Sequence, residues 1–211
     1  MKKIIVMSGS FNPPTIMHHK AMLAALEVLD ASQGIYVPTP AKSLRYKMRK
    51  YGFPDEVISE ELRIRMLHAM SEDDSRLEVS DIECRHAKWH AMETMRYFKS
   101  IYPDSELYYL IGSDKLAMFL RSHRLVEFLT DFHFAVVIRN REYVEPILAE
   151  SNDAFTRRER FEIIPSPIEN DGISSTLVRE YYRLGIPDTG RMLHPKVAEL
   201  MQETAIYKNF Q

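Results

Sequence analysis

The stretch KKIIVMSGSFNPPTIMHHK, residues 2–20, predicts a buried strand, a turn and the start of a helix. The first turn of a helix exposes backbone N–H groups and partial positive charge, so acidic side chains are usually found there. This helix begins instead with His18, His19 and Lys20. Basic residues at that position are favourable when an anion binds among them, so the stretch predicts an anion site at the end of a strand.

The turn itself suits a phosphate group. Gly9 lets the backbone approach a ligand closely, and Asn12 is pushed out of the helical region by the proline that follows it. Thr15 can cap the helix, and His18 adds an imidazole donor in the first helical turn. An ordinary strand–turn–helix with surface histidines is the alternative. We expect His19, about 100° further round the helix, to be solvated rather than catalytic.

A second helix start repeats this pattern late in the chain. The segment GISSTLVRE, residues 172–180, carries three hydroxyl residues of the capping type and then Arg179, which we place in the first helical turn. Arginine suits bidentate contact with phosphate. Alone, the segment is equally well explained as a serine cap with an incidental arginine. Together with residues 9–18 it predicts a clamp for a polyphosphate.

Apolar runs of strand length alternate along the chain with stretches of helical period. The predicted strands cover residues 2–9, 34–40, 76–83, 106–114, 132–140 and 160–167. The predicted helices cover residues 18–29, 59–73, 89–103, 115–122, 124–131, 174–185 and 194–204. This order predicts the α/β class: a Rossmann-like, doubly wound parallel sheet in three layers with a small C-terminal helical part. Residues 38–58 are the least regular segment, basic at first and then loop-like, and are a candidate for a lid over the edge of the sheet where its strands end.

The composition excludes two classes of function. With 211 residues, one domain over residues 1–211 is the expectation. The 28 Lys and Arg residues and 30 Asp and Glu residues give a net charge of −2, which argues against a nucleic-acid partner. The first apolar run is too short for a signal peptide or a membrane span. The single cysteine, Cys84, fits a reducing compartment, so we expect a cytoplasmic protein with no membrane partner.

The pair GSFNPPTIMH and ISSTLVR, at residues 9–18 and 173–179, resembles the nicotinate/nicotinamide mononucleotide adenylyltransferases. These belong to the nucleotidyltransferase superfamily, whose signatures are (H/T)xGH and ISSTxxR. Thr15 and His18 stand at the two ends of the first signature, with Met17 where bacterial members have Gly. The segment YYLIGSDKL, residues 108–116, is similar to the fourth-strand motif of the family. There Gly112 and Asp114 occupy the positions that contact the adenosine side.

The resemblance implies a single nucleotidyltransferase domain with direct adenylyl transfer. The phosphate of a pyridine mononucleotide attacks the α-phosphate of ATP and releases pyrophosphate, with Mg²⁺ bridging the ATP phosphates. It implies that His18 stabilises charge on the α-phosphate and that Arg179 holds the β- and γ-phosphates. ATP and the mononucleotide are the expected partners, and whether the protein forms a homo-oligomer is left open. The residues implied to bind ATP or its phosphates are Gly9, Ser10, Phe11, Thr15, Met17, Gly112, Asp114, Ser174, Ser175 and Thr176.

The basic segment AKSLRYKMRK, residues 41–50, lies where the family carries a His or Lys that reaches the phosphates. Lys42, Arg45 and Lys47 all qualify. We assign Lys42 to catalysis and the other two to phosphate binding, and we expect at least one of the three to contact phosphate. The alternative is a solvated basic loop.

The chain departs from the family where the pyridine ring is held. Bacterial members have a Tyr-Thr pair where this chain has His90 and Ala91. Eukaryotic members have a tryptophan at the second of these positions, whereas Trp89 lies two residues earlier. We predict that Trp89 and His90 bind the mononucleotide and leave the choice between nicotinate and nicotinamide open. Transfer to another phosphorylated acceptor, such as phosphopantetheine, and a non-catalytic nucleotide-binding sensor are the alternatives.

A competing metal-binding pattern lies in the same segment. Cys84, His86 and His90 form the pattern C-x-H-x₃-H, and two histidines four residues apart on a helix can share a metal ion. No fourth ligand is evident nearby, and structural zinc sites normally combine two separated pairs. The sequence therefore predicts no protein-bound metal.

Overall fold

The computed structural model describes residues 1–53, 55–139, 143–168, 172–186 and 190–203. The strands are β1 (Lys2–Gly9), β2 (Gln33–Pro38), β3 (Leu77–Val79), β4 (Ser105–Gly112), β5 (His133–Val137) and β6 (Phe161–Ile164). The helices are α1 (Ile16–Leu29), α2 (Ala41–Lys50), α3 (Glu60–Ser71), α4 (Ile82–Arg85), α5 (Ala91–Ile101), α6 (Ser113–Leu120), α7 (Leu125–Asp131), α8 (Val144–Ala149), α9 (Asn152–Phe155), α10 (Ser175–Arg183) and α11 (Pro195–Glu203), with a 3₁₀ turn at Arg158–Arg160.

The six strands form one sheet in the order β3-β2-β1-β4-β5-β6. The pairings β1–β4, β4–β5 and β5–β6 are parallel, with Lys2 opposite Ser105 and Val137 opposite Ile164. This is the strand order of the doubly wound Rossmann fold, in which the direction of winding reverses between the first and fourth strands. The predicted α/β Rossmann-like class is therefore confirmed.

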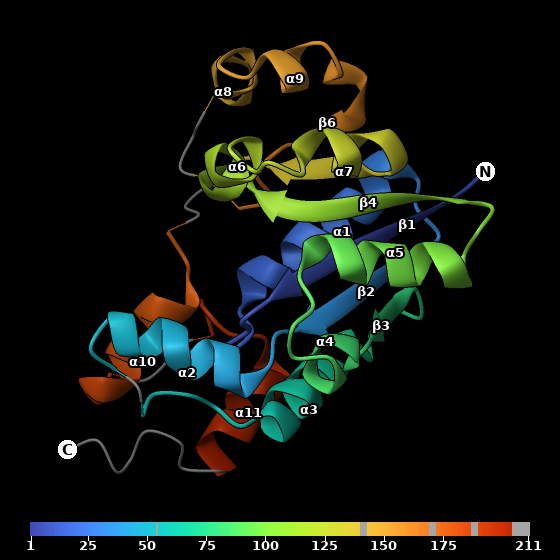
Figure 1. Ribbon diagram of the computed structural model, residues 1–211. Helices are drawn as coiled ribbons and strands as arrows, with labels where there is room; N and C mark the ends of the chain where they lie inside the picture. Colours follow the sequence, from blue (N-terminus) through green and yellow to red (C-terminus); the bar gives the residue numbers. More distant parts are fainter. Residues whose placement is uncertain (54, 140–142, 169–171, 187–189, 204–211) are drawn as a thin grey trace. The chain divides into compact units, whose positions relative to one another are not determined.

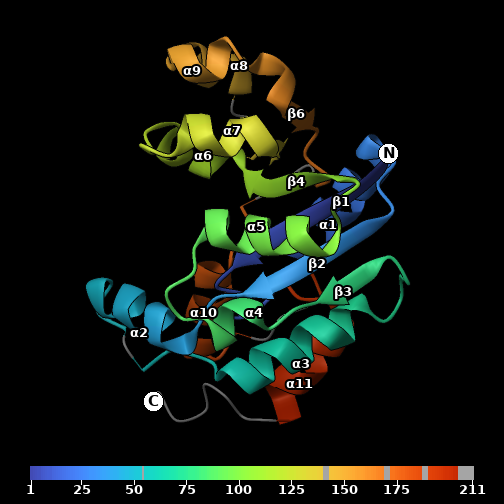
Figure 2. The same ribbon diagram turned by 45° about the vertical axis from the view of Figure 1, so that its right-hand side comes forward.

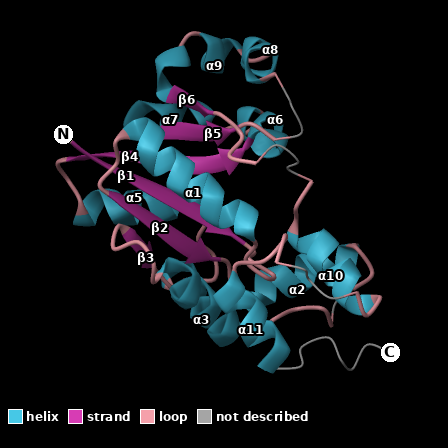
Figure 3. Ribbon diagram, turned by 180° about the vertical axis from the view of Figure 1, so that it is seen from behind, coloured by secondary structure: helices cyan, strands magenta, loops and turns pink. Residues whose placement is uncertain are grey.

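The described chain divides into two compact units. The first contains Met1–Met7, Ala21–Ile35 and His90–Gly172. In it α5 packs on β4 through one apolar face, and α1 covers the opposite face of the sheet, as Figures 1 and 3 show from the front and from behind. The strands are near-continuous apolar runs because both faces are covered.

The second unit contains Ser8–Lys20, Tyr36–Trp89 and Ile173–Gln211. In it α3 and α11 lie side by side (Figure 2). Met66 and Met70 of α3 and Val197 and Met201 of α11 are buried. None of the helices in the described ranges is long and apolar enough to cross a membrane.

The basic first half of residues 38–58, for which no helix was predicted, forms α2 over residues 41–50. Ala41, Leu44 and Met48 recur at helical spacing and are buried, while the charged residues between them are exposed. The Ala41 N–H donates to Glu60 Oε1 at 2.5 Å, which places an acid at the helix N-terminus. The remaining prediction of a lid is untested.

One prediction of an element is wrong, and two further short helices were missed. The third strand was expected over residues 76–83, but β3 is Leu77–Val79 and a short helix, α4, follows. Helices α8 and α9 were not anticipated, since their segments are short and weakly periodic. The predicted helix ends, by contrast, were confirmed where the signal is local. Ser59 Oγ caps α3 through Leu62 N, and Gly185, at φ 68°, closes α10 with Ile186 N donating to Tyr181 O.

Candidate active site

The turn after β1 is compact and its backbone is tightly held. Phe11 adopts a left-handed conformation (φ 42°), which turns its side chain back over Gly9. A Cβ at Gly9 would lie 3.2 Å from Phe11 Cζ, so glycine is needed here to seat the Phe11 ring. The ring also meets His18 edge-on, with centroids 5.0 Å apart. The Phe11 ring thus helps to fix the position of the His18 ring.

His18 lies in the first turn of α1, as predicted, and its tautomer is set by the turn. The Thr15 backbone N–H donates to His18 Nδ1 at 3.0 Å, and Thr15 Oγ1 lies 2.8 Å from the same nitrogen. Because Nδ1 accepts a hydrogen bond, the proton of a neutral ring resides on Nε2. His18 therefore presents an N–H donor, which is the form needed for contact with an anion. Met17, the family's glycine position, is buried beside it.

Arg63, a buried arginine that was not predicted from the sequence, binds the backbone of this turn. Arg63 is 0% exposed, and burial lowers its pKa from the usual value. NH1 donates to Ser10 O at 2.8 Å and NH2 to Thr39 O at 2.7 Å, while Nε donates to Ile58 O at 3.2 Å. Three backbone carbonyls thereby satisfy one buried guanidinium and are fixed by it.

The start of α10, at residues 174–176, also contacts this turn. Ser174 Oγ caps α10 by accepting from Leu177 N at 3.1 Å, as predicted. Ser175 Oγ donates to Pro13 O at 2.7 Å, and Thr176 Oγ1 accepts from Arg179 NH2 at 3.2 Å. The two motifs that the sequence identified at opposite ends of the chain are therefore in direct contact.

Arg179 is not in the first turn of its helix, contrary to expectation. α10 begins at Ser175, so Arg179 lies one turn further on and is only 7% exposed. Its NH1 donates to Asn12 O at 2.8 Å, and its Nε lies 3.4 Å from Glu56 Oε2. The guanidinium is buried against the turn, and the N–H groups not used in these contacts are the ones through which it can meet an anion.

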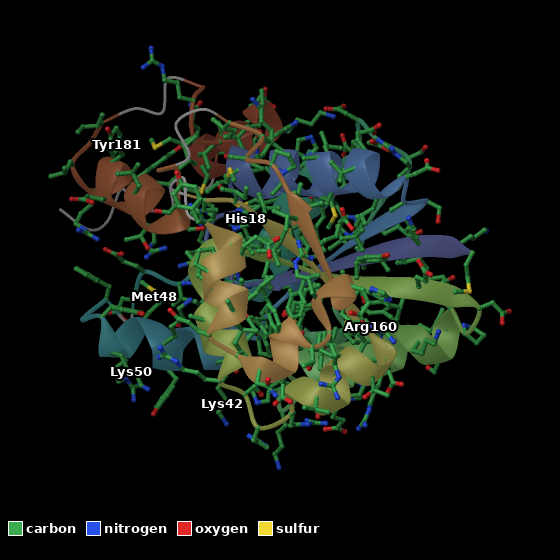
Figure 4. All side chains as sticks on the ribbon, turned by 90° about the horizontal axis from the view of Figure 1, so that it is seen from above. His18, Lys42, Met48, Lys50, Arg160 and Tyr181 are labelled. Atoms are coloured by element: carbon green, nitrogen blue, oxygen red, sulfur yellow. The ribbon has the colours of Figure 1, made fainter. Side chains whose placement is uncertain are left out.

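The three basic candidates of α2 do not share one side of the helix. Arg45 and Lys47 are separated by about 200° around the helix axis. Lys47 Nζ donates to Ser10 Oγ at 3.4 Å, so it lies over the turn. Lys42 is exposed, and in Figure 4 Lys42 and Lys50 lie on the other side of α2 from Met48. Of the three, Lys47 has a contact with the turn residues.

His19 is not solvated, contrary to expectation. It is 8% exposed and its ring meets that of His194 at 5.1 Å. Burial lowers the pKa of both imidazoles, and their mutual repulsion lowers that of His19 further. Ile16 N donates to Met192 O at 2.9 Å, which ties the start of α1 to the segment that carries His194.

A second strand-to-helix turn lies in the first unit, at the end of β4. Gly112 precedes α6, and a Cβ there would overlap Asp114 Oδ1 and lie 2.8 Å from Arg139 Cδ. Ser113 Oγ accepts from Arg139 N at 2.9 Å. Asp114 pairs with Lys115 Nζ at 3.2 Å and lies 4.0 Å from Arg139 NH1. A side chain at residue 112 would thus displace the Asp114 carboxylate, which was predicted to contact adenosine, and Arg139 is a neighbour that was not predicted.

The segment predicted to hold the mononucleotide is partly occupied by its own contacts. The Trp89 ring stacks on His86 at 4.2 Å, with an angle of 13° between planes. His90 is exposed, and its backbone N–H donates to Glu93 Oε2 at 3.1 Å at the start of α5. Whether either residue binds a mononucleotide stays a prediction.

The competing metal pattern in this segment finds no support in its geometry. Cys84 Sγ donates to Pro38 O at 3.2 Å, and burial raises the pKa of the thiol to about 11. A thiol held in this way is a poor metal ligand, because thiolate is the form that binds. Within the described ranges, no three His, Cys, Asp or Glu side chains are grouped to hold a metal ion.

The geometry around the turn after β1 suits an anionic ligand such as phosphate. Backbone groups of a strand-to-helix turn are combined with an imidazole donor, a buried arginine and a lysine, which is the usual composition of a polyphosphate site. The model of the cytidylyltransferase-like family matches residues 6–181, and the chain belongs to that family.

The curated relatives narrow the class further. A protein of Geobacillus thermodenitrificans, named "Probable nicotinate-nucleotide adenylyltransferase", is 28% identical over 98% of this chain and 87% of its own length. One of Nitratiruptor sp. with the same name is 30% identical over 65% of this chain and 73% of its own length. Among solved structures, the nicotinic acid mononucleotide adenylyltransferase of Plasmodium falciparum complexed with NaAD has a TM-score of 0.77 at 17% identity. The structural alignment spans 99% of this chain and 98% of the Plasmodium chain, which supports the fold.

Proposed function

We propose that the protein transfers the adenylyl group of ATP to a pyridine mononucleotide, giving a dinucleotide and pyrophosphate in NAD biosynthesis. The observation that carries the proposal is the contact between the two terminal motifs, in which Ser175 and Arg179 bind the carbonyls of Pro13 and Asn12 beside His18. The names of the relatives, which specify nicotinate, favour the acid over the amide as acceptor.

The reaction follows from the charges of the site. A phosphate oxygen of the mononucleotide forms a bond to the α-phosphorus of ATP, and the bond from that phosphorus to the bridging oxygen of the β-phosphate breaks. His18 Nε2–H donates to the α-phosphate as negative charge develops there. Arg179 stabilises the departing pyrophosphate. The chain supplies position and charge rather than a covalent intermediate.

Mg²⁺ is proposed to enter with ATP as part of the substrate. It prefers phosphate oxygens and water to a cage built only of protein ligands. Lys47, at 3.4 Å from Ser10 Oγ, is the α2 residue that we assign to the phosphates. This proposal replaces the assignment of Lys42 to catalysis: Lys42, Arg45 and Lys47 are all exposed, and Lys47 contacts Ser10. The cytoplasm is the proposed compartment, supported by the single cysteine, which excludes an internal disulfide.

The experiment that tests this function measures pyrophosphate release with Mg²⁺, ATP and either nicotinate or nicotinamide mononucleotide. We expect release with both compounds or with nicotinate mononucleotide alone, and the ratio of kcat/KM gives the preference. Phosphopantetheine in a third reaction tests the alternative acceptor, which is favoured by the divergent segment around Trp89. ATP binding without release in any reaction would indicate a nucleotide-binding sensor instead.

A further inference from the structure

A buried carboxylate lies next to the candidate active site, and the chemistry described above does not use it. Glu56 follows α2 in the second unit and is 5% exposed. Removing a carboxylate from water is costly unless charged partners and hydrogen bonds replace the lost hydration. The partners of the Glu56 carboxylate therefore indicate its role.

Two arginines of α10 meet this carboxylate. Arg183 binds Oε1 through Nε at 2.9 Å and through NH2 at 2.8 Å. Arg179 Nε lies 3.4 Å from Oε2. The two arginines are four residues apart and so lie on the same face of the helix. Glu56 thus forms ion pairs with both Arg179 and Arg183.

The backbone around Glu56 is fixed by the turn that Arg179 also holds. Asn12 Nδ2 donates to Glu56 O at 2.7 Å, and Ile58 N donates to Asn12 Oδ1 at 2.8 Å. Arg179 NH1 in turn donates to Asn12 O. The contacts form a closed ring from the Asn12 side chain through Glu56 and Arg179 back to the Asn12 carbonyl.

We propose that Glu56 is a positioning residue for the adenylyl-transfer reaction. Its carboxylate orients the Arg179 guanidinium. One edge of the guanidinium then binds the turn after β1, and its remaining N–H groups contact the departing pyrophosphate. Arg183 holds Glu56 from its more exposed side. The inference rests on the proposed function, and it assigns to Glu56 a role that neither terminal motif contains.

The test compares Glu56→Gln with Asp55→Asn in steady-state pyrophosphate release. Glu56→Gln keeps the shape of the side chain and removes its charge, while Asp55→Asn removes an exposed carboxylate one residue away. We expect Glu56→Gln to lower kcat and raise KM for ATP so that kcat/KM for ATP falls roughly ten- to a hundredfold. KM for the mononucleotide and all parameters of Asp55→Asn stay within about twofold of wild type.

A double-mutant cycle with Arg179→Lys separates positioning from a general loss of structure. If Glu56 acts through Arg179, adding Glu56→Gln to Arg179→Lys costs little more than Arg179→Lys alone. Glu56→Asp, which keeps the charge, is expected to recover most of kcat. Thermal unfolding of each variant shows how much folded protein is assayed. If Glu56→Gln does not fold, Arg183→Lys, which weakens the hold on Glu56 Oε1, provides the comparison with a milder change.

Three outcomes would overturn the inference. They are kcat/KM for ATP in Glu56→Gln equal to wild type, additive losses with Arg179→Lys, and a lower KM for ATP. The last would mean that Glu56 competes with phosphate for Arg179 and inhibits binding. Inactive wild-type protein, in contrast, would contradict the proposed function itself and would be seen before any variant is made.

Discussion

Two strand-to-helix turns carry the candidate ligand chemistry, and they are held together in different ways. The turn after β1 is fixed by cations from far along the chain, since Arg63 binds Ser10 O across 53 residues and Arg179 binds Asn12 O across 167. The turn after β4 is held by contacts nearer in the chain, such as Ser113 Oγ, which accepts from the backbone N–H of Arg139, 26 residues away. The first turn gathers positive charge and the second presents the carboxylate of Asp114. This difference matches two ligand chemistries: phosphate oxygens accept hydrogen bonds, whereas sugar hydroxyls donate them to a carboxylate.

The strongest way to break the first turn is Arg63→Met. It leaves three carbonyls without their donor, so we expect a loss of about 3 kcal/mol or more in the free energy of unfolding. That corresponds to a fall of roughly 10 °C in Tm for a chain of this size. The measurement is thermal unfolding, with Arg65→Met, an exposed arginine on the same helix, as the control. Equal Tm values for the two variants would show that the buried arginine does not hold the turn.

The chemistry of the first turn is tested by His18→Ala. The donor to the α-phosphate is lost while the turn keeps its arginines, so we expect kcat to fall about 10²- to 10³-fold. ATP affinity, measured by calorimetry, changes far less, because the other contacts to the phosphates remain. Unchanged turnover would remove the catalytic assignment of His18, and loss of ATP binding would make it a binding residue.

The second turn is tested by Gly112→Ala. The added methyl group displaces the Asp114 carboxylate, because the new Cβ would overlap Oδ1. We expect KM for ATP to rise several-fold, with about 1–2 kcal/mol lost in stability through overpacking. The matched control is Gly172→Ala, since a Cβ there has no atom within 4 Å. A normal KM in Gly112→Ala would argue against a nucleotide role for this turn.

The smallest effect is expected from the histidine pair beside the first turn. Burial lowers the pKa of His19 and His194, Asp73 opposes this for both, and Lys20 and Lys196 add to it. Between the lowered pKa values and the unfolded value of about 6.5, the unfolded chain binds more protons. Stability is therefore complete above that value and is lost as the pH falls through it.

This pH dependence can be measured as Tm between pH 7.5 and roughly pH 5. The wild type should lose a few degrees more than His194→Gln over this interval. His68→Gln, which removes an exposed histidine of α3, is the control and should follow the wild type. Parallel curves for all three proteins would show that the buried pair does not contribute.

What the sequence revealed was local. The order of the six strands, the His18 position in the first turn and the Ser174 cap depend on neighbours within four residues, and each was predicted correctly. α2 was missed because its buried face consists of only three residues in a basic run. Its capping acid, Glu60, comes from another helix. Helix formation there depends on tertiary packing rather than on propensity.

The rest of the site could not be read in advance for a different reason. Arg63 and Arg179 bind backbone carbonyls, and every residue of the chain carries a carbonyl, so no pattern marks which one an arginine takes. Glu56 likewise looks like any loop acid until Asn12 and Arg183 are placed around it. An arginine among apolar residues in α3 was the one available signal, because a buried charge at that spacing needs a partner.

The contacts between α10 and the turn after β1 also imply an order of events during synthesis. Pro13 and Asn12 leave the ribosome early, while their partners lie 162 and 167 residues further on. Such long-range contacts form late, because the entropy of bringing distant segments together must first be overcome. A growing chain therefore completes the turn after β1 only after residues 175–179 have been made.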